Sequence, residues 1–117
     1  MLWHPLTDIN QLHDILRSSK EQSSKKSTVL LFKHSTRCSI SSMALNRFET
    51  KWKDDETIQT YYLDLLNHRD VSNEIASVLN VDHASPQVLL IRNGYCFYHN
   101  SHNAINVADI LEAINKE

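Results

Sequence analysis

The stretch TVLLFKHSTRCSIS, residues 28–41, decides the fold of this chain. Its first half, Thr28 to His34, is a short continuous apolar run, which is typical of a strand buried on both faces of a sheet. Ser35-Thr36-Arg37 predicts a turn, and a helix is expected to follow from about Cys38 to Lys53. One face of that helix collects residues at helical spacing, namely Ser41, Ala44, Leu45, Phe48 and Trp52. A buried strand therefore leads through a turn into a helix that begins with a cysteine.

The segments on either side continue the alternation of helices and strands. Thr7 is expected to cap a first helix with an apolar face, and the polar residues 18–27 are expected to form a loop. Alternating or apolar runs predict strands over 57–65, 87–91 and 95–99, and periodic runs predict helices over 67–79 and 106–115. Asn93-Gly94 predicts the tight turn of a hairpin between the last two strands.

The order of elements is therefore αβαβαββα. Strand–helix–strand units favour right-handed crossovers and parallel pairing, whereas the hairpin adds antiparallel strands. The simplest closure is an α/β fold with a four-stranded mixed sheet flanked by helices, which is the thioredoxin-like fold. A chain of 117 residues is long enough to bury a core of its own, so one domain is expected over residues 1–117.

Composition argues against several classes of function. The net charge is −2, with 12 basic and 14 acidic residues, which gives no reason to expect nucleic acid or an anionic membrane as partner. No apolar run approaches the length that crosses a bilayer, and residues 1–8 lack the pattern of a signal peptide, so a cytoplasmic location is expected. Gly94 is the only glycine, which excludes a Gly-rich phosphate loop. We expect a monomer without a metal or a tightly bound cofactor.

Cys38 is the candidate nucleophile. The free N–H groups and the dipole of a helix start favour the thiolate, which is the attacking species in thiol–disulfide exchange. Arg37 adds positive charge beside it, and His34 would add more if it were protonated. The alternative is an inert buried cysteine, but the polar neighbours of Cys38 favour an exposed turn. The sequence therefore predicts thiol–disulfide chemistry at Cys38.

A serine occupies the position that holds the second cysteine of a dithiol redox enzyme. Such enzymes use Cys-X-X-Cys, whereas this chain reads Cys38-Ser39-Ile40-Ser41. The hydroxyl of Ser41 can donate a hydrogen bond to the thiolate but cannot form a disulfide. Cys96, the other cysteine, is interpreted as a packed strand residue. The pattern predicts a monothiol mechanism in which a second thiol comes from outside.

Two further segments are candidates for the site. Proline after Ser85 at a strand start suits a cis Ser85-Pro86 bond, although the sequence by itself favours an ordinary trans bond. In a thioredoxin-like fold this loop lies beside the cysteine, where the backbone of Ser85 can pair with an extended substrate. Ser101 and His102, with His34, are expected to line a substrate pocket. A zinc site that combines His99 and His102 with Cys38 and His34 is less favoured, because structural zinc sites usually offer more thiolates.

These residues, in this order, resemble the monothiol bacilliredoxins, the YtxJ-type thioredoxin-like family. The resemblance covers most of the chain and is densest over residues 33–41, and it continues at residues 61–63, 85–87, 93–94 and 99–102. It implies removal of bacillithiol, a low-molecular-weight thiol, from mixed disulfides on cytosolic client proteins. Cys38 matches the reactive cysteine of the family and Pro86 its cis-proline. Members often carry proline directly after the cysteine, and Ser39 departs from this pattern, which predicts altered thiolate stability or reduction potential with activity retained.

The expected function is therefore a monothiol exchange with bacillithiol as co-substrate. Cys38 would take bacillithiol from a bacillithiolated client protein, and free bacillithiol or a second redoxin would restore Cys38. Two alternatives remain open. One is a monothiol glutaredoxin-like protein that binds an iron–sulfur cluster or another metal through Cys38, and whose preparation would be brown. The other is a non-catalytic thioredoxin-fold stress or adaptor module, which the pH dependence of Cys38 alkylation would separate from an active redoxin.

Overall fold

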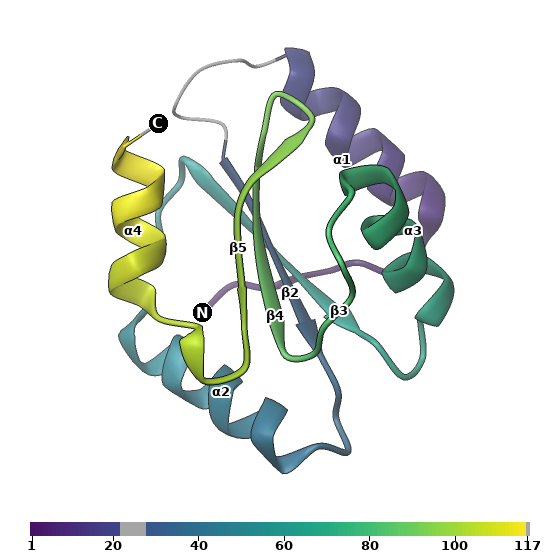
Figure 1. The fold of residues 1–117 in the computed structure, drawn as a ribbon. Coiled ribbons are helices and arrows are strands. Elements are labelled where there is room, and N and C mark those ends of the chain that lie inside the picture. Colours follow the sequence, from purple (N-terminus) through teal and green to yellow (C-terminus); the bar gives the residue numbers. More distant parts are fainter. Residues whose placement is uncertain (22–27, 117) are drawn as a thin grey trace.

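The computed structural model describes residues 1–21 and 28–116, and Figure 1 shows a central sheet with helices on both sides. The elements in chain order are β1 (His4–Pro5), α1 (Ile9–Glu21), β2 (Thr28–His34), α2 (Ser39–Lys51), β3 (Ile58–Asp64), α3 (Arg69–Leu79), β4 (Gln87–Arg92), β5 (Tyr95–Ser101), the short 3₁₀ helix η1 (His102–Ala104) and α4 (Val107–Lys116). None of the helices within these described residues is long and apolar enough to span a membrane.

The sheet has the strand order β1-β3-β2-β4-β5. β3 runs parallel to both β1 and β2, whereas β4 runs antiparallel to both β2 and β5. This mixed sheet between helices confirms the α/β, thioredoxin-like fold. The described sheet has five strands where four were expected, because His4 and Pro5 pair with Tyr61 and Tyr62. A strand of two residues carries no alternation that a sequence pattern can detect.

Most element boundaries lie within two residues of their predicted positions, and the first helix differs most. Asp8, not Thr7, caps α1, because its carboxylate accepts a hydrogen bond from the Asn10 N–H at 2.9 Å. The helix also continues to Glu21, into residues that were expected to form a loop. The buried Ser19 hydroxyl donates to the Leu16 carbonyl at 2.7 Å and accepts from the Gly94 N–H at 2.8 Å, which fixes the last turn against the β4–β5 hairpin. The rest of the expected loop, residues 22–27, lies outside the described residues.

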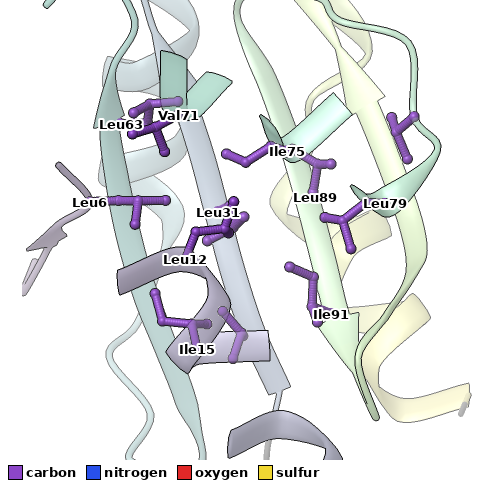
Figure 2. Packing of buried hydrophobic residues seen from close by; sticks show 12 residues of the cluster. Leu6, Leu12, Ile15, Leu31, Leu63, Val71, Ile75, Leu79, Leu89 and Ile91 are labelled. Carbon is purple, nitrogen blue, oxygen red and sulfur yellow. The ribbon is translucent and has the colours of Figure 1, made fainter. Parts of the chain in front are cut away.

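The core has two parts, one on each face of the sheet. All seven residues of β2 are buried, which explains its continuous apolar run. Val29 and Leu31 face α1 and α3, in the cluster shown in Figure 2. Leu30 and Phe32 face the opposite side, where they pack with residues of α2 and α4. Because β2 is held from both faces, the turn that follows it has a fixed starting point.

Asn93 and Gly94 form the hairpin turn, as predicted. Both have positive φ angles, 53° and 76°, which is the backbone that tight two-residue hairpin turns require. The hairpin orients β5 so that its last residues return to the end of the sheet at which β2 finishes. That end of the sheet carries the candidate site.

Candidate functional site

Cys38 occupies the N-cap position of α2, directly beyond the end of β2. Its backbone is extended, with φ −106° and ψ 120°, and its carbonyl accepts a hydrogen bond from the Ser42 N–H at 3.0 Å. The Cys38 N–H itself donates to the Ser35 carbonyl at 3.1 Å, which closes the turn over residues 35–38. The side chain is partly exposed, and Arg37 and Ser39 on either side are exposed. Cys38 therefore lies partly exposed at the start of α2.

Ser41 lies one turn further along α2 and is fully buried. Its hydroxyl lies 2.7 Å from Nδ1 of His34 and accepts a hydrogen bond from the Ser35 N–H at 3.1 Å. Among the described residues, the Ser41 hydroxyl forms these two hydrogen bonds and no hydrogen bond to Cys38. The expected hydrogen bond from Ser41 to the Cys38 thiolate is therefore absent, because this face of α2 packs on the end of β2. Ser41 instead fixes the first turn of α2 against β2.

His34 is buried beneath that turn. Burial lowers the pKa of His34 below its ordinary value of 6.5, and the charges of Asp64 and Glu49 oppose this shift only in part. The ring packs at a tilt against Tyr62, with ring centres 5.7 Å apart. His34 is therefore neutral at neutral pH and supplies no positive charge there, which leaves Arg37 as the expected cation that carries charge next to Cys38.

The Ser85-Pro86 peptide bond is cis. The expectation of a trans bond from the sequence alone was wrong, and the resemblance indicated the correct isomer. Lys33 pairs with Gln87 in the β2–β4 register, so the residues that precede Gln87 lie beside the end of β2. Pro86 is buried and Ser85 is partly exposed. The loop thus lies at the same end of the sheet as the turn that carries Cys38.

Ser101 and His102 reach the same end of the sheet from β5. Ser101 pairs with Gln87, and the His102 N–H donates to the Pro86 carbonyl at 3.1 Å. Nδ1 of His102 lies 3.1 Å from the Ser101 hydroxyl, and η1, which begins at His102, contacts α2. The structure therefore brings the segments of Cys38, Pro86 and Ser101-His102 to one end of the molecule.

Cys96 lies at the opposite end of the sheet. It pairs with Ile91, which pairs with Val29 near the start of β2. Five residues of strand separate Val29 from His34, a distance of about 17 Å at about 3.3 Å per residue. A disulfide needs Cα atoms within about 7 Å of each other, so Cys38 and Cys96 cannot join within one chain. Burial raises the pKa of the Cys96 thiol, which further limits its reactivity.

Lys33 is a buried cation that was not among the predicted site residues. Its ammonium group donates to the Ser72 carbonyl and to Nδ1 of His83, both at 3.3 Å. Burial lowers the pKa of Lys33 from 10.5 to about 8. A lysine directly after the apolar residues 29–32 was the signal that could have drawn attention to it. No group of three or more His, Cys, Asp or Glu side chains that could hold a metal occurs within residues 1–21 and 28–116.

Comparison with known proteins agrees with this geometry. The family model described as monothiol bacilliredoxin BrxC matches residues 4–110. A solved structure described as a candidate oxidoreductase with a thioredoxin fold is 32% identical, with a TM-score of 0.76 over 93% of this chain and 90% of its own. The thioredoxin of Malassezia sympodialis is 14% identical, with a TM-score of 0.70 over 98% of this chain and 90% of its own. The thioredoxin of Fasciola hepatica is 15% identical, with a TM-score of 0.69 over 97% of each chain.

The two thioredoxins show the shared fold, and the family model carries the assignment further. It spans the strand, the turn, the cysteine, the cis-proline loop and the hairpin that together form the candidate site. This chain belongs to the monothiol bacilliredoxin family, whose members are oxidoreductases with a thioredoxin-like fold.

Proposed function

We propose that this chain removes bacillithiol from S-bacillithiolated proteins through Cys38. The observation that carries the proposal is the position of Cys38. It is the partly exposed N-cap residue of α2, Ser41 stands where a dithiol enzyme has its second cysteine, and Cys96 lies at the far end of the sheet. The proposed partners are bacillithiolated client proteins and either free bacillithiol or a second redoxin, in the cytoplasm.

The first step is a disulfide exchange. The Cys38 thiolate attacks the bacillithiol sulfur of the mixed disulfide, a new S–S bond forms, and the old S–S bond breaks. The electron pair of the broken bond leaves with the client sulfur, which takes a proton from solvent. The start of α2 and the charge of Arg37 stabilise the negative charge that passes between the reacting sulfurs. The backbone of Ser85, the loop residue before Pro86, offers an edge on which an extended client segment can pair.

The second step restores Cys38. The thiolate of a second molecule attacks the bacillithiol sulfur bound to Cys38, and the Cys38 sulfur leaves as a thiolate. Ser41 has no sulfur to perform this attack, and the register of the sheet keeps Cys96 out of reach. The bacillithiolated form of Cys38 should therefore persist until an external thiol arrives.

Substitution of each cysteine tests the proposal. Cys38→Ser should abolish the release of bacillithiol from a bacillithiolated client protein, whereas Cys96→Ser should retain most of it. The mass of the client protein before and after incubation measures the release. Equal loss in the two variants would contradict a monothiol mechanism, because it would give both sulfurs a role.

A further inference from the structure

A hollow of about 330 Å³ opens beside the turn that leads into α2. Thr36 and Arg37 of the turn form one wall, and the segment between β3 and α3 forms the other with Leu66, Asn67 and Arg69. The two walls meet because β2 and β3 are parallel and His34 pairs with Asp64 at their ends. Cys38 follows Arg37 directly, so their Cα atoms are about 3.8 Å apart. Arg37 of the hollow is therefore the residue directly before the proposed nucleophile, although Cys38 itself does not line the hollow.

The two arginines of the hollow are exposed, and neither forms an ion pair with a carboxylate among the described residues. Asp64 and Asp70 are the acidic residues that flank Arg69 in the chain. Asp64 accepts a hydrogen bond from the Asn67 amide at 2.7 Å, and Asp70 is exposed at the position after Arg69. Two arginines without an ion pair among the described residues thus line one small hollow.

The charge of Arg69 acts on a neighbouring side chain, His83. Burial lowers the pKa of His83, and the charges of Lys33 and Arg69 lower it further. Lys33 and Arg69 therefore place positive charge close to His83, in a chain whose net charge is −2.

We propose that this hollow binds carboxylate groups on the small-thiol half of the disulfide substrate, with Arg37 and Arg69 as the pairing residues. The proposal rests on the function proposed above and adds the chemistry that selects the small thiol. The planar, fork-shaped guanidinium group suits a carboxylate, the Thr36 hydroxyl and the Asn67 amide offer further hydrogen bonds, and Leu66 contacts carbon. The size of the hollow fits a small acid better than a folded client.

The subsite also decides which sulfur Cys38 attacks. A carboxylate held beside Arg37 places the sulfur a few bonds away next to the Cys38 thiolate. The new S–S bond then forms with the small thiol, and the other sulfur of the broken bond leaves with the electron pair and takes a proton from solvent. The small thiol is transferred to Cys38, and the client is released with a free thiol.

Two symmetrical disulfides test the proposal. The disulfide of mercaptosuccinate carries two carboxylates on each half, and the disulfide of 2-mercaptoethanol carries none. The rate of adduct formation on Cys38 is measured for each by intact mass and peptide mapping, and their ratio gives the preference for the acid. Arg69→Gln should lower this ratio about fivefold, and Arg37→Gln should lower it in the same direction. Added salt should lower the ratio of the unsubstituted chain as well.

Arg47→Gln is the matched control, because Arg47 is an exposed arginine of α2 that does not line the hollow. It makes the same change in net charge and should leave the ratio unchanged. If the ratio of adduct rates were the same in the unsubstituted chain and in all three arginine variants, the subsite would be overturned. Adducts on Cys38 of the unsubstituted chain would in that case still support the proposed function. Absence of any adduct on Cys38 from either disulfide would overturn both.

A last experiment tests whether the carboxylate comes from the small thiol or from the client protein. It uses a peptide that carries aspartate next to a cysteine in mixed disulfide with 2-mercaptoethanol. Arg69→Gln should slow the reaction with this peptide less than the reaction with the mercaptosuccinate disulfide. A larger effect on the peptide would show that the hollow serves the client and would overturn the assignment to the small thiol.

Discussion

Lys33 places a fully buried positive charge near the end of β2, after the apolar residues 29–32. The ammonium group has two partners, the Ser72 carbonyl and the His83 ring, and neither is an anion. Removing such a charge from water is unfavourable, and the lowered pKa of about 8 records this cost. The identity of this residue was plain in the sequence, but its partners were not, because they lie 39 and 50 residues away.

Replacing this buried charge should stabilise the fold. Lys33→Met keeps the length of the side chain and removes the charge, so the free energy of unfolding should rise by about 1–2 kcal/mol at pH 7. In the unsubstituted chain, stability should increase as pH rises from about 8 to 10.5, because the folded chain loses this proton first. Urea unfolding measures both effects. Lys51→Met, at an exposed position, is the control, and a clear loss of stability in Lys33→Met would contradict the account.

His34 makes the stability of the fold depend on pH in the acidic range, below that of Lys33. Its pKa is lower in the folded chain than the ordinary 6.5, so the unfolded chain binds this proton at a higher pH. The contribution to stability is full above pH 6.5 and is lost as pH falls through the lower pKa of the folded chain. His83 shifts in the same direction and adds to the loss.

Asparagine at position 34 isolates this contribution. His34→Asn retains an amide group near the place of Nδ1, next to Ser41, and cannot be protonated. Urea unfolding at several pH values should therefore show a shallower loss of stability on acidification than in the unsubstituted chain. His99→Asn, at an exposed position of β5, should leave the slope as it was. An unchanged slope in His34→Asn would show that burial of this ring does not couple folding to its protonation.

At the scale of the elements, the first turn of α2 determines the kind of chemistry. The N-cap cysteine presents one sulfur to the substrate. The serine one turn later is buried and packs against β2. The sequence was sufficient to predict the strand, the turn and this helix, because the apolar run and the helical spacing are strong local signals. It did not predict the partner of Ser41, since the His34 ring and the Ser41 hydroxyl meet only when α2 folds back on β2.

A second cysteine in this turn should change the kinetics of the adduct. Ser41→Cys places a thiol one helical turn from Cys38, as in dithiol redox enzymes. The mixed disulfide on Cys38 should then be short-lived, because the new thiol attacks it within the same molecule and releases bacillithiol. Mass spectrometry after a brief exposure to bacillithiol disulfide measures the surviving adduct. Ser42→Cys adds the same atom at a neighbouring position and should preserve the adduct, and equal survival in both variants would contradict this role of the turn.

The other elements show where sequence patterns stop being informative. Periodicity located the longer helices and strands because each buries a stripe or a face of apolar side chains. It missed β1, whose two residues have no period, and it ended α1 too early, because the polar Ser19 is buried only through its contact with the hairpin. The isomer of the Ser85-Pro86 bond was likewise beyond the sequence alone, because the same dipeptide is compatible with both.

At the scale of the whole molecule, the sheet register separates the two cysteines and assembles the site. The ends of β2, β4 and β5 bring the turn of Cys38, the loop of Pro86 and the segment of Ser101-His102 to one end. The start of β2 and the hairpin carry Cys96 to the other end. The element order in the sequence predicted this arrangement in outline, whereas the hollow between Arg37 and Arg69 depends on how the β3–α3 connection packs beside the turn.

The central claim is that a single sulfur, that of Cys38, accepts the small thiol and holds it. The most direct measurement is intact mass with peptide mapping after the reduced chain is incubated with bacillithiol disulfide and, separately, with glutathione disulfide. The account predicts one adduct, on Cys38, that forms faster from bacillithiol disulfide. Two results would contradict it. One is the loss of two hydrogen atoms from the chain, with peptide mapping that shows a disulfide between Cys38 and Cys96. The other is an adduct on Cys96 alone.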